Sequence, residues 1–132
     1  MSESSKLKIF LVDDDRFLLD MYSLKFQNNG FEVSACTSPN EALTKLRDGY
    51  VPDIMMVDLI MPVMDGVELI TKAKEEGFIK NVVLVILTNQ GQQSDIDRAK
   101  QAGVHGYIVK ASTIPSEVLQ EVKGIYAANH KK

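Results

Sequence analysis

The segment DIMMVD, residues 53–58, is a short apolar run that ends in a carboxylate. A second segment, VVLVIL at residues 82–87, is apolar at every position. A strand with one face in solvent alternates apolar and polar side chains, whereas a continuous apolar string is typical of a parallel strand that is covered on both faces. The two segments therefore predict buried strands of a parallel sheet.

Further apolar runs and helix-length amphipathic stretches extend this pattern in both directions. The predicted strands are residues 8–12, 31–36, 53–57, 82–87 and 106–109. The predicted helices are residues 16–28, 39–48, 66–76, 94–102 and 115–128. Ser38 followed by Pro39 is a typical helix start, and Gly30 is a typical helix stop. This alternation in a chain of 132 residues predicts a single doubly wound α/β domain with a core at about residues 7–128.

Composition places the chain among small globular proteins. Apolar residues make up 45% of it, and no apolar run approaches the length of about 18 residues that a membrane span needs. The N-terminal sequence MSESSKLK lacks the apolar region of a signal peptide. The single Cys36 excludes an intramolecular disulfide, and a net charge of −3 with scattered basic residues gives no footprint for nucleic acid. We therefore expect a cytoplasmic protein that contacts neither membrane nor nucleic acid directly.

Polar residues directly follow four of the predicted strands. They are Asp13, Asp14 and Asp15 after the first, Asp58 after the third, Thr88 after the fourth and Lys110 after the fifth. An aspartate in such a place is commonly a turn former or a helix cap, and Asp15 is the expected cap of the first helix. Ligands of doubly wound sheets, however, bind outside the carboxyl ends of the strands. Polar residues from several strands at that edge therefore predict a functional site.

The chemistry of this set points to a metal ion and a phosphoryl group. Adjacent carboxylates repel one another unless a cation offsets their charge, and hard carboxylate oxygens select Mg²⁺. A carboxylate can also accept a phosphoryl group, whose equatorial oxygens must then be positioned and neutralised. The metal, the ammonium of Lys110 and the hydroxyl of Thr88 could each meet one of these oxygens.

We expect neither His105 nor His130 to bind a metal, because no second histidine or cysteine lies at ligand spacing.

Four motifs in order, FLVDDD, MMVDLIMPVMDG, ILTNQG and GYIVK, resemble the receiver domain of two-component response regulators. The resemblance covers about residues 7–127 and extends to stand-alone regulators of the chemotaxis type. It implies a flavodoxin-like fold, in which a five-stranded parallel sheet of order 2-1-3-4-5 is covered by five helices. It also implies a phosphorylatable signalling switch with Mg²⁺ as cofactor. Such a domain catalyses its own phosphotransfer and dephosphorylation and is not otherwise an enzyme.

The resemblance also assigns roles to residues at matching positions. Asp58 is the implied phosphoacceptor, with Thr88 and Lys110 as its catalytic partners. The implied Mg²⁺ ligands are Asp14 directly, Asp13 largely through water, Asp58, and the backbone carbonyl of Ile60. Thr88 and Tyr107 are the implied switch residues, since the family draws this hydroxyl toward the phosphoryl group and turns this aromatic ring inward.

Two positions depart from the commonest receiver pattern. Asn89 stands where a small residue is usual, and we interpret it as a polar loop filler rather than a restriction on the phosphodonor. Ala111 stands where proline is usual. A cis bond before alanine would cost about 2.5–4 kcal/mol against trans, so we predict a trans bond between Lys110 and Ala111.

The implied partners are a sensor histidine kinase or a histidine phosphotransfer protein, together with a downstream protein target. We expect a monomer or a weak dimer that depends on phosphorylation. The residues after Lys110 suffice for one helix, so we expect no output domain within this sequence, whereas a longer protein could add a DNA-binding or enzymatic output domain.

The first predicted helix offers a candidate docking surface for the phosphodonor. Its spacing predicts that Leu18, Met21 and Tyr22 face the sheet. Phe17 and Leu24 flank that stripe, so we expect their side chains to be partly exposed. They could anchor a helical bundle that carries the phosphohistidine.

A phosphatase of the haloacid dehalogenase type is the alternative from another functional class. Its motif, D-x-D-x-[T/V] after the first strand, is half matched by residues 13–17, and Asp13 would then be the nucleophile. Phe17 breaks the motif, and no terminal acid pair follows Lys110. The nucleophile distinguishes the two hypotheses: Asp58 in a receiver, and Asp13 in a phosphatase.

Overall fold

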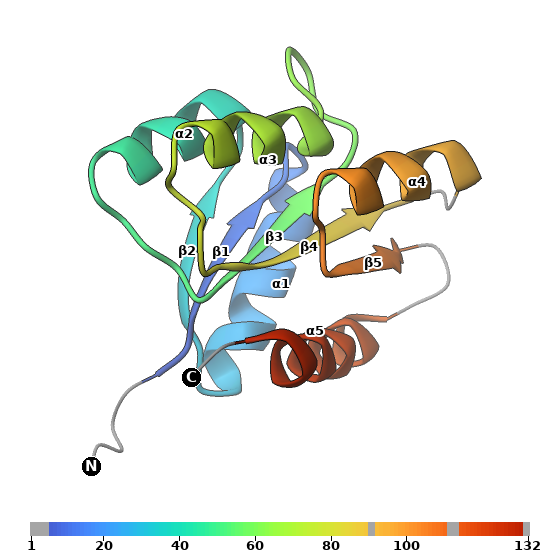
Figure 1. The fold of residues 1–132 in the computed structure, drawn as a ribbon. Coiled ribbons are helices and arrows are strands. Elements are labelled where there is room, and N and C mark those ends of the chain that lie inside the picture. Colours follow the sequence, from blue (N-terminus) through green and yellow to red (C-terminus); the bar gives the residue numbers. More distant parts are fainter. Residues whose placement is uncertain (1–5, 90–91, 111–113, 131–132) are drawn as a thin grey trace.

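The computed structural model describes residues 6–89, 92–110 and 114–130, and within these ranges five strands alternate with five helices (Figure 1). The strands are β1 (Lys8–Val12), β2 (Glu32–Cys36), β3 (Ile54–Asp58), β4 (Val83–Thr88) and β5 (Gly106–Val109). The helices are α1 (Arg16–Asn28), α2 (Pro39–Arg47), α3 (Gly66–Glu75), α4 (Gln93–Gln101) and α5 (Pro115–Asn129). The predicted doubly wound fold is confirmed, and element ends differ from the prediction by one residue at most.

The strands form a parallel sheet in the order β2-β1-β3-β4-β5, as predicted. In its register, Val12 of β1 pairs with Val57 of β3, and Asp58 pairs with Leu87 of β4. Asp13 follows Val12 and Asp58 follows Val57 along the chain. The register therefore brings these two carboxylates to the same edge of the sheet.

Helices cover both faces of the sheet. α1 and α5 lie on one face, and α2, α3 and α4 lie on the other (Figure 1). The first face buries Phe26, and the second buries Phe10 and Leu43. β3 lies between the two layers and is buried at every position, which explains its unbroken apolar string.

The buried stripe of α1 differs from the prediction. Leu19, Tyr22 and Phe26 are buried, whereas Leu18 and Met21 are half-buried at the edge of the core. Positions 19, 22 and 26 have the i, i+3, i+7 spacing of one helix face. This face of α1 packs against the sheet because it carries the larger apolar area, including the ring of Phe26.

Local signals set the helix ends. Asp15 caps α1 as predicted, since its carboxylate accepts a hydrogen bond from the Leu18 N–H at 3.2 Å. Ser38 caps α2 in the same way. Gly30 follows α1 with φ of +90°, a conformation that glycine adopts without strain. None of the helices in the described ranges is long and apolar enough to cross a membrane.

His105 has a structural role that the sequence did not indicate. Its backbone N–H donates to the Leu84 carbonyl at 2.8 Å, and the Leu84 N–H donates to Nδ1 of the His105 ring at 2.9 Å. An Nδ1 that accepts carries no proton, so the ring is neutral in this arrangement. Burial, and then the charge of Lys74, lower the pKa of His105.

His105→Ala should lower the free energy of unfolding by about 1–2 kcal/mol, because the N–H of Leu84, a buried residue of β4, loses its acceptor. A histidine whose pKa is lowered by folding stabilises fully above its unfolded value of 6.5, and this stabilisation is lost as the pH falls below it. In urea denaturation, the difference between wild type and His105→Ala should therefore shrink from about pH 7.5 to about pH 5.5. His130→Ala is the control, and an equal loss in that variant would contradict the role of His105.

Candidate functional site

The buried polar side chains of the described residues gather at the carboxyl edge of the sheet. They are Asp13, which is 4% exposed, Asp58, which is 7% exposed, and Thr88, which is 1% exposed. They come from the ends of β1, β3 and β4, and all three are predicted site residues. A buried carboxylate is unfavourable unless it is paired or hydrogen-bonded, so this cluster needs a compensating charge.

Lys110 supplies a compensating charge from the end of β5. Its Nζ lies 3.1 Å from Asp13 Oδ2 and 3.2 Å from Asp58 Oδ1, and its side chain is 7% exposed. Burial by itself would lower the pKa of this ammonium, but the attraction of Asp58 and Asp13 outweighs burial and raises it. Lys110 is therefore charged at neutral pH and connects β5 to β1 and β3.

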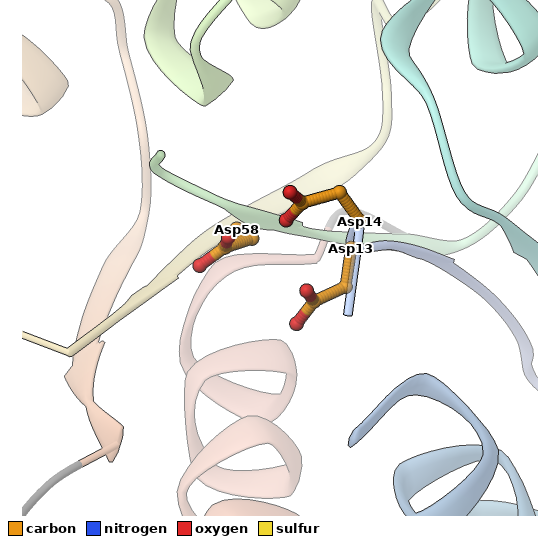
Figure 2. Close-up of side chains that lie close together, drawn as sticks. All are labelled: Asp13, Asp14 and Asp58. Atoms are coloured by element: carbon orange, nitrogen blue, oxygen red, sulfur yellow. The ribbon is translucent and has the colours of Figure 1, made fainter. Parts of the chain in front are cut away.

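Asp14 completes a group of three carboxylates. Oxygens of Asp13, Asp14 and Asp58 lie within 4.8 Å of one another, and Figure 2 shows the three side chains gathered at the strand ends. Both oxygens of Asp13 are engaged, because Oδ1 accepts from the Asp15 N–H at 2.9 Å and Oδ2 accepts from Lys110. Asp14, by contrast, is exposed to solvent.

The pKa of the Asp58 carboxyl is raised to about 6. Burial is the largest cause, and the charge of Asp13 adds to it, while Lys110 opposes both. The ammonium of Lys110 therefore does not fully offset the crowding of carboxylates. A divalent cation would supply further positive charge, and a compact set of carboxylate oxygens is the donor set that Mg²⁺ prefers. The residues present fit Mg²⁺.

A pocket of about 470 Å³ opens over this cluster. At about 30 Å³ per water molecule, it has room for a hydrated ion and a phosphoryl group. Its lining residues are Asp13, Asp14, Asp15, Leu18, Asp58, Ile60, Thr88, Asn89, Gln92, Asp95 and Lys110. Ile60 lies in the loop after β3, whereas Gln92 and Asp95 lie at the start of α4, so the two walls of the pocket come from different parts of the chain.

Thr88 and Tyr107 lie on neighbouring strands, since β4, which ends at Thr88, pairs with β5. The half-buried Tyr107 packs against the core on the face of α2, α3 and α4. Burial, and then the charge of Asp95, raise the pKa of Tyr107, while the hydrogen bond to Thr88 opposes them. The structure thus brings the two predicted switch residues together beside Asp95.

Ala111 lies outside the described residues, and with it the predicted trans bond after Lys110.

Asp65 and Gly66, where the loop after β3 joins α3, shape the backbone next to Asp58, a role that the sequence analysis did not identify. The Gly66 N–H donates to the Leu59 carbonyl at 2.8 Å, and a Cβ at Gly66 would lie 2.6 Å from the carbonyl oxygen of Asp58. A larger residue at this position would displace the backbone of Asp58. Asp65 forms a reciprocal cap with Glu68 at the start of α3. The D-x-x-E pattern was the signal that could have shown this cap.

Residues 9–123 match the family model described as the response regulator receiver domain. The match spans most of the chain. The chain belongs to this family.

Relatives of this receiver domain differ in length. The chemotaxis protein CheY of Halobacterium salinarum is 28% identical over 121 residues, which cover 92% of this chain and 98% of that protein. The phosphate regulon transcriptional regulatory protein PhoB of Escherichia coli is 25% identical over 118 residues, which cover 89% of this chain but 51% of that protein. This receiver domain therefore spans about half the length of the second relative.

Solved structures share the fold of this receiver domain. The chemotaxis protein CheY4 of Vibrio cholerae has a TM-score of 0.84 and 26% identity, with coverage of 92% of this chain and 99% of that chain. A CheY-like receiver domain protein of Methanospirillum hungatei has a TM-score of 0.85 and 25% identity, with coverage of 95% and 97%. These likenesses agree with the flavodoxin-like topology seen here.

Asp58 should reduce the stability of this receiver domain in Mg²⁺-free solution. An acid whose pKa is raised by folding binds its proton more tightly in the folded state, so the free energy of unfolding falls as the pH rises from 3.8 to about 6. Asp58→Asn removes this dependence and should raise the free energy of unfolding by about 1–2 kcal/mol at neutral pH. Urea denaturation in a chelating buffer measures the difference.

The exposed Asp48 provides the matched control for this prediction. Asp48→Asn should give no such gain, and Mg²⁺ should narrow the gap by stabilising wild type. An Asp58→Asn variant no more stable than Asp48→Asn would contradict the prediction.

Proposed function

We propose that this receiver domain is a phosphorylatable switch in which Asp58 accepts a phosphoryl group from a phosphohistidine donor, with Mg²⁺ as cofactor. The position of Asp58 carries the proposal. Its buried carboxylate ends β3, lies 3.2 Å from Lys110 Nζ and belongs to a cluster with Asp13 and Asp14. Phosphoryl transfer depends on positioning and charge neutralisation, and this arrangement offers a nucleophile, a cation and metal-binding oxygens together.

Asp58 is the nucleophile in this proposal. With a pKa of about 6, most of its carboxyl is ionised at neutral pH. One carboxylate oxygen forms a bond to phosphorus while the bond from phosphorus to the donor imidazole nitrogen breaks, and the electron pair of that bond returns to the imidazole. The product is an acyl phosphate on Asp58.

Mg²⁺, when bound, would neutralise charge on the phosphoryl oxygens. The exposed carboxylate of Asp14 and that of Asp58 would be direct ligands, together with the backbone carbonyl of Ile60. Asp13 would act through water, because both of its oxygens already accept hydrogen bonds.

Lys110 and Thr88 would hold the phosphoryl group from the other strands. Lys110 already contacts Asp58, so its ammonium is placed to meet a phosphoryl oxygen on that carboxylate. The Thr88 hydroxyl would donate to another oxygen. Because β4, which ends at Thr88, pairs with β5, which carries Tyr107, a shift of Thr88 toward the phosphoryl group would let Tyr107 turn inward and change the surface of α4, β5 and α5.

The proposed donor is a sensor histidine kinase or a histidine phosphotransfer protein, and the phosphorylated domain would bind a downstream protein target. Phe17 and Leu24 are 77% and 59% exposed, which confirms the predicted exposure. Phe17 follows the acidic turn closely, so this pair could anchor a helical donor beside the pocket. We propose that the domain is a monomer or a weak dimer that depends on phosphorylation.

A phosphatase with Asp13 as nucleophile gains no support from these observations. The family match favours a receiver. Asp13 is also held by hydrogen bonds at both oxygens, one from the Asp15 backbone and one from Lys110.

Incubation of wild type with Mg²⁺ and acetyl phosphate should add one phosphoryl group to the intact mass, because acetyl phosphate is a small donor that needs no docking surface. Hydroxylamine should remove the adduct, as it cleaves acyl phosphates, and chelation of Mg²⁺ should prevent its formation. Asp58→Asn should abolish the adduct, and Asp14→Asn should strongly reduce it by removing a metal ligand.

The control for this labelling is again Asp48→Asn, which should label like wild type. An adduct that survives Asp58→Asn but is lost in Asp13→Asn would assign the nucleophile to Asp13 and favour the phosphatase.

Phe17→Ala should slow transfer from a cognate phosphohistidine protein, because it removes an exposed apolar anchor, while leaving labelling by acetyl phosphate unchanged. The measurement is the transfer rate from the phosphorylated donor. Val51 provides a matched control, since it is 65% exposed and precedes β3 at the opposite edge of the sheet. Equal slowing in Val51→Ala, or slowed acetyl phosphate labelling in Phe17→Ala, would argue against docking at Phe17.

A further inference from the structure

The loop between β3 and α3, residues 59–65, forms one wall of the pocket, and we name it the acceptor loop. Ile60 of this loop lines the pocket. The loop is closed by the hydrogen bond from the Gly66 N–H to the Leu59 carbonyl, and it ends at Asp65, which caps α3. Figure 1 shows it on the same side of the sheet as α4.

Arg98 of α4 reaches this loop from a distant part of the sequence. Its Nη2 donates to Asp65 Oδ2 at 2.9 Å, while Asp65 Oδ1 accepts the capping hydrogen bond from the Glu68 N–H at 2.8 Å. Both oxygens of Asp65 are therefore occupied, one within α3 and one by α4. The end of the acceptor loop is thus held from two directions.

The same guanidinium also contacts the opposite wall of the pocket. Nη1 of Arg98 lies 3.6 Å from Oδ1 of Asp95, which lines the pocket from the first turn of α4. Separate nitrogens of one rigid, planar group meet the two carboxylates, an arrangement that the single ammonium of a lysine reproduces poorly. After burial, the charge of Asp95 is the next cause that raises the pKa of Tyr107, so Asp95 lies near the proposed switch residue as well.

We propose that Arg98 is a positioning residue for the phosphorylation pocket, joining the acceptor loop through Asp65 to the pocket-lining turn of α4 through Asp95. The inference rests on the proposed function, because it is the Mg²⁺ and phosphoryl site that this link would hold in shape. Loss of Arg98 would remove one of the two contacts that hold the end of the acceptor loop, and so loosen the wall that carries the Ile60 carbonyl, which we propose as a metal ligand.

Loss of Arg98 could change Mg²⁺ affinity in two ways, through the position of the pocket wall or through long-range charge, and the two predict changes of opposite sign. Removing a positive charge near an acidic pocket would by itself strengthen Mg²⁺ binding. Loosening a wall that carries a ligand would weaken it. The ion pair has side chains that are 43% and 28% exposed, and pairs of this exposure change an equilibrium constant by at most about five-fold.

The experiment compares Mg²⁺ affinity of the unphosphorylated domain in wild type and Arg98→Gln, by titration followed in amide NMR spectra. The chain offers a matched control in Arg47→Gln. Arg47 pairs with Glu76 at 2.7 Å with side chains 46% and 28% exposed, but it joins α2 to the end of α3, away from the pocket. Both variants lose one positive charge. Arg47→Gln loses the pair with Glu76, whereas Arg98→Gln loses the pairs with both Asp65 and Asp95.

Arg98→Gln should weaken Mg²⁺ binding by about two- to five-fold and speed hydrogen exchange of the Gly66 amide, whereas Arg47→Gln should do neither. Arg98→Lys should restore the affinity in part, since it keeps the charge but not the two-carboxylate contact. An affinity that is unchanged or raised in Arg98→Gln, or lowered equally in Arg47→Gln, would overturn the proposal.

A double variant provides a second, independent test. Asp65→Asn removes the charge of Asp65 but keeps an N-cap acceptor, so α3 remains capped. If Arg98 acts through Asp65, the double variant should bind Mg²⁺ no more weakly than the weaker single variant. If the two changes instead have opposite signs and cancel in the double variant, charge alone explains them and the positioning role is wrong.

These readouts also separate this inference from the proposed function. Adduct formation on Asp58 in wild type decides whether the domain is phosphorylated. The comparison of Arg98→Gln with Arg47→Gln uses metal affinity and amide exchange in unphosphorylated protein. The inference can therefore fail while the proposed function holds, and the reverse outcome is equally visible.

Discussion

A buried ammonium held between two carboxylates is the interaction on which the functional edge of this protein depends. Lys110 leaves β5 at one end of the sheet and reaches Asp13 after β1, although the two residues are 97 positions apart in sequence. The contact spans β3 and β4, and its long, flexible side chain makes that reach possible. Without this cation, the buried carboxylates of Asp13 and Asp58 would lose the one positive group that contacts both of them among the described residues.

The compensation is incomplete, and this is where stability and function conflict. Burial and the charge of Asp13 keep the pKa of Asp58 at about 6 in spite of Lys110. A core built for stability would place apolar or neutral side chains at such strand ends. Carboxylates retained there are a local cost that the surrounding apolar sheet offsets, as is common at functional sites. The uncompensated negative charge also makes the carboxyl edge of the sheet a suitable binding site for a divalent metal ion.

The two walls of the pocket connect the strand ends to helices α3 and α4. One wall follows Asp58 directly and is fixed by Gly66, which leaves room for the Asp58 carbonyl, and by the cap at Asp65. The other wall includes Asn89, Gln92 and Asp95, and Asp95 lies close enough to affect Tyr107. Arg98 contacts both walls. The shape of the site therefore depends on how several elements pack against one another. Asp95 of α4 and Tyr107 of β5 connect the site to the surface of those two elements.

Local patterns in the sequence specify the element order, the buried strands and the polar residues that end them. Continuous apolar strings, caps such as Asp15 and the strand-end rule are local or pairwise signals, so the sequence alone suffices to select Asp58, Thr88 and Lys110. Tertiary packing settled the remaining features. It placed Leu19 rather than Leu18 in the core, gave His105 a backbone partner on β4, and paired Arg98 with Asp65. Each of these depends on how a helix or loop is rotated and packed against its neighbour, and side-chain contacts between distant elements leave no periodic trace in the sequence.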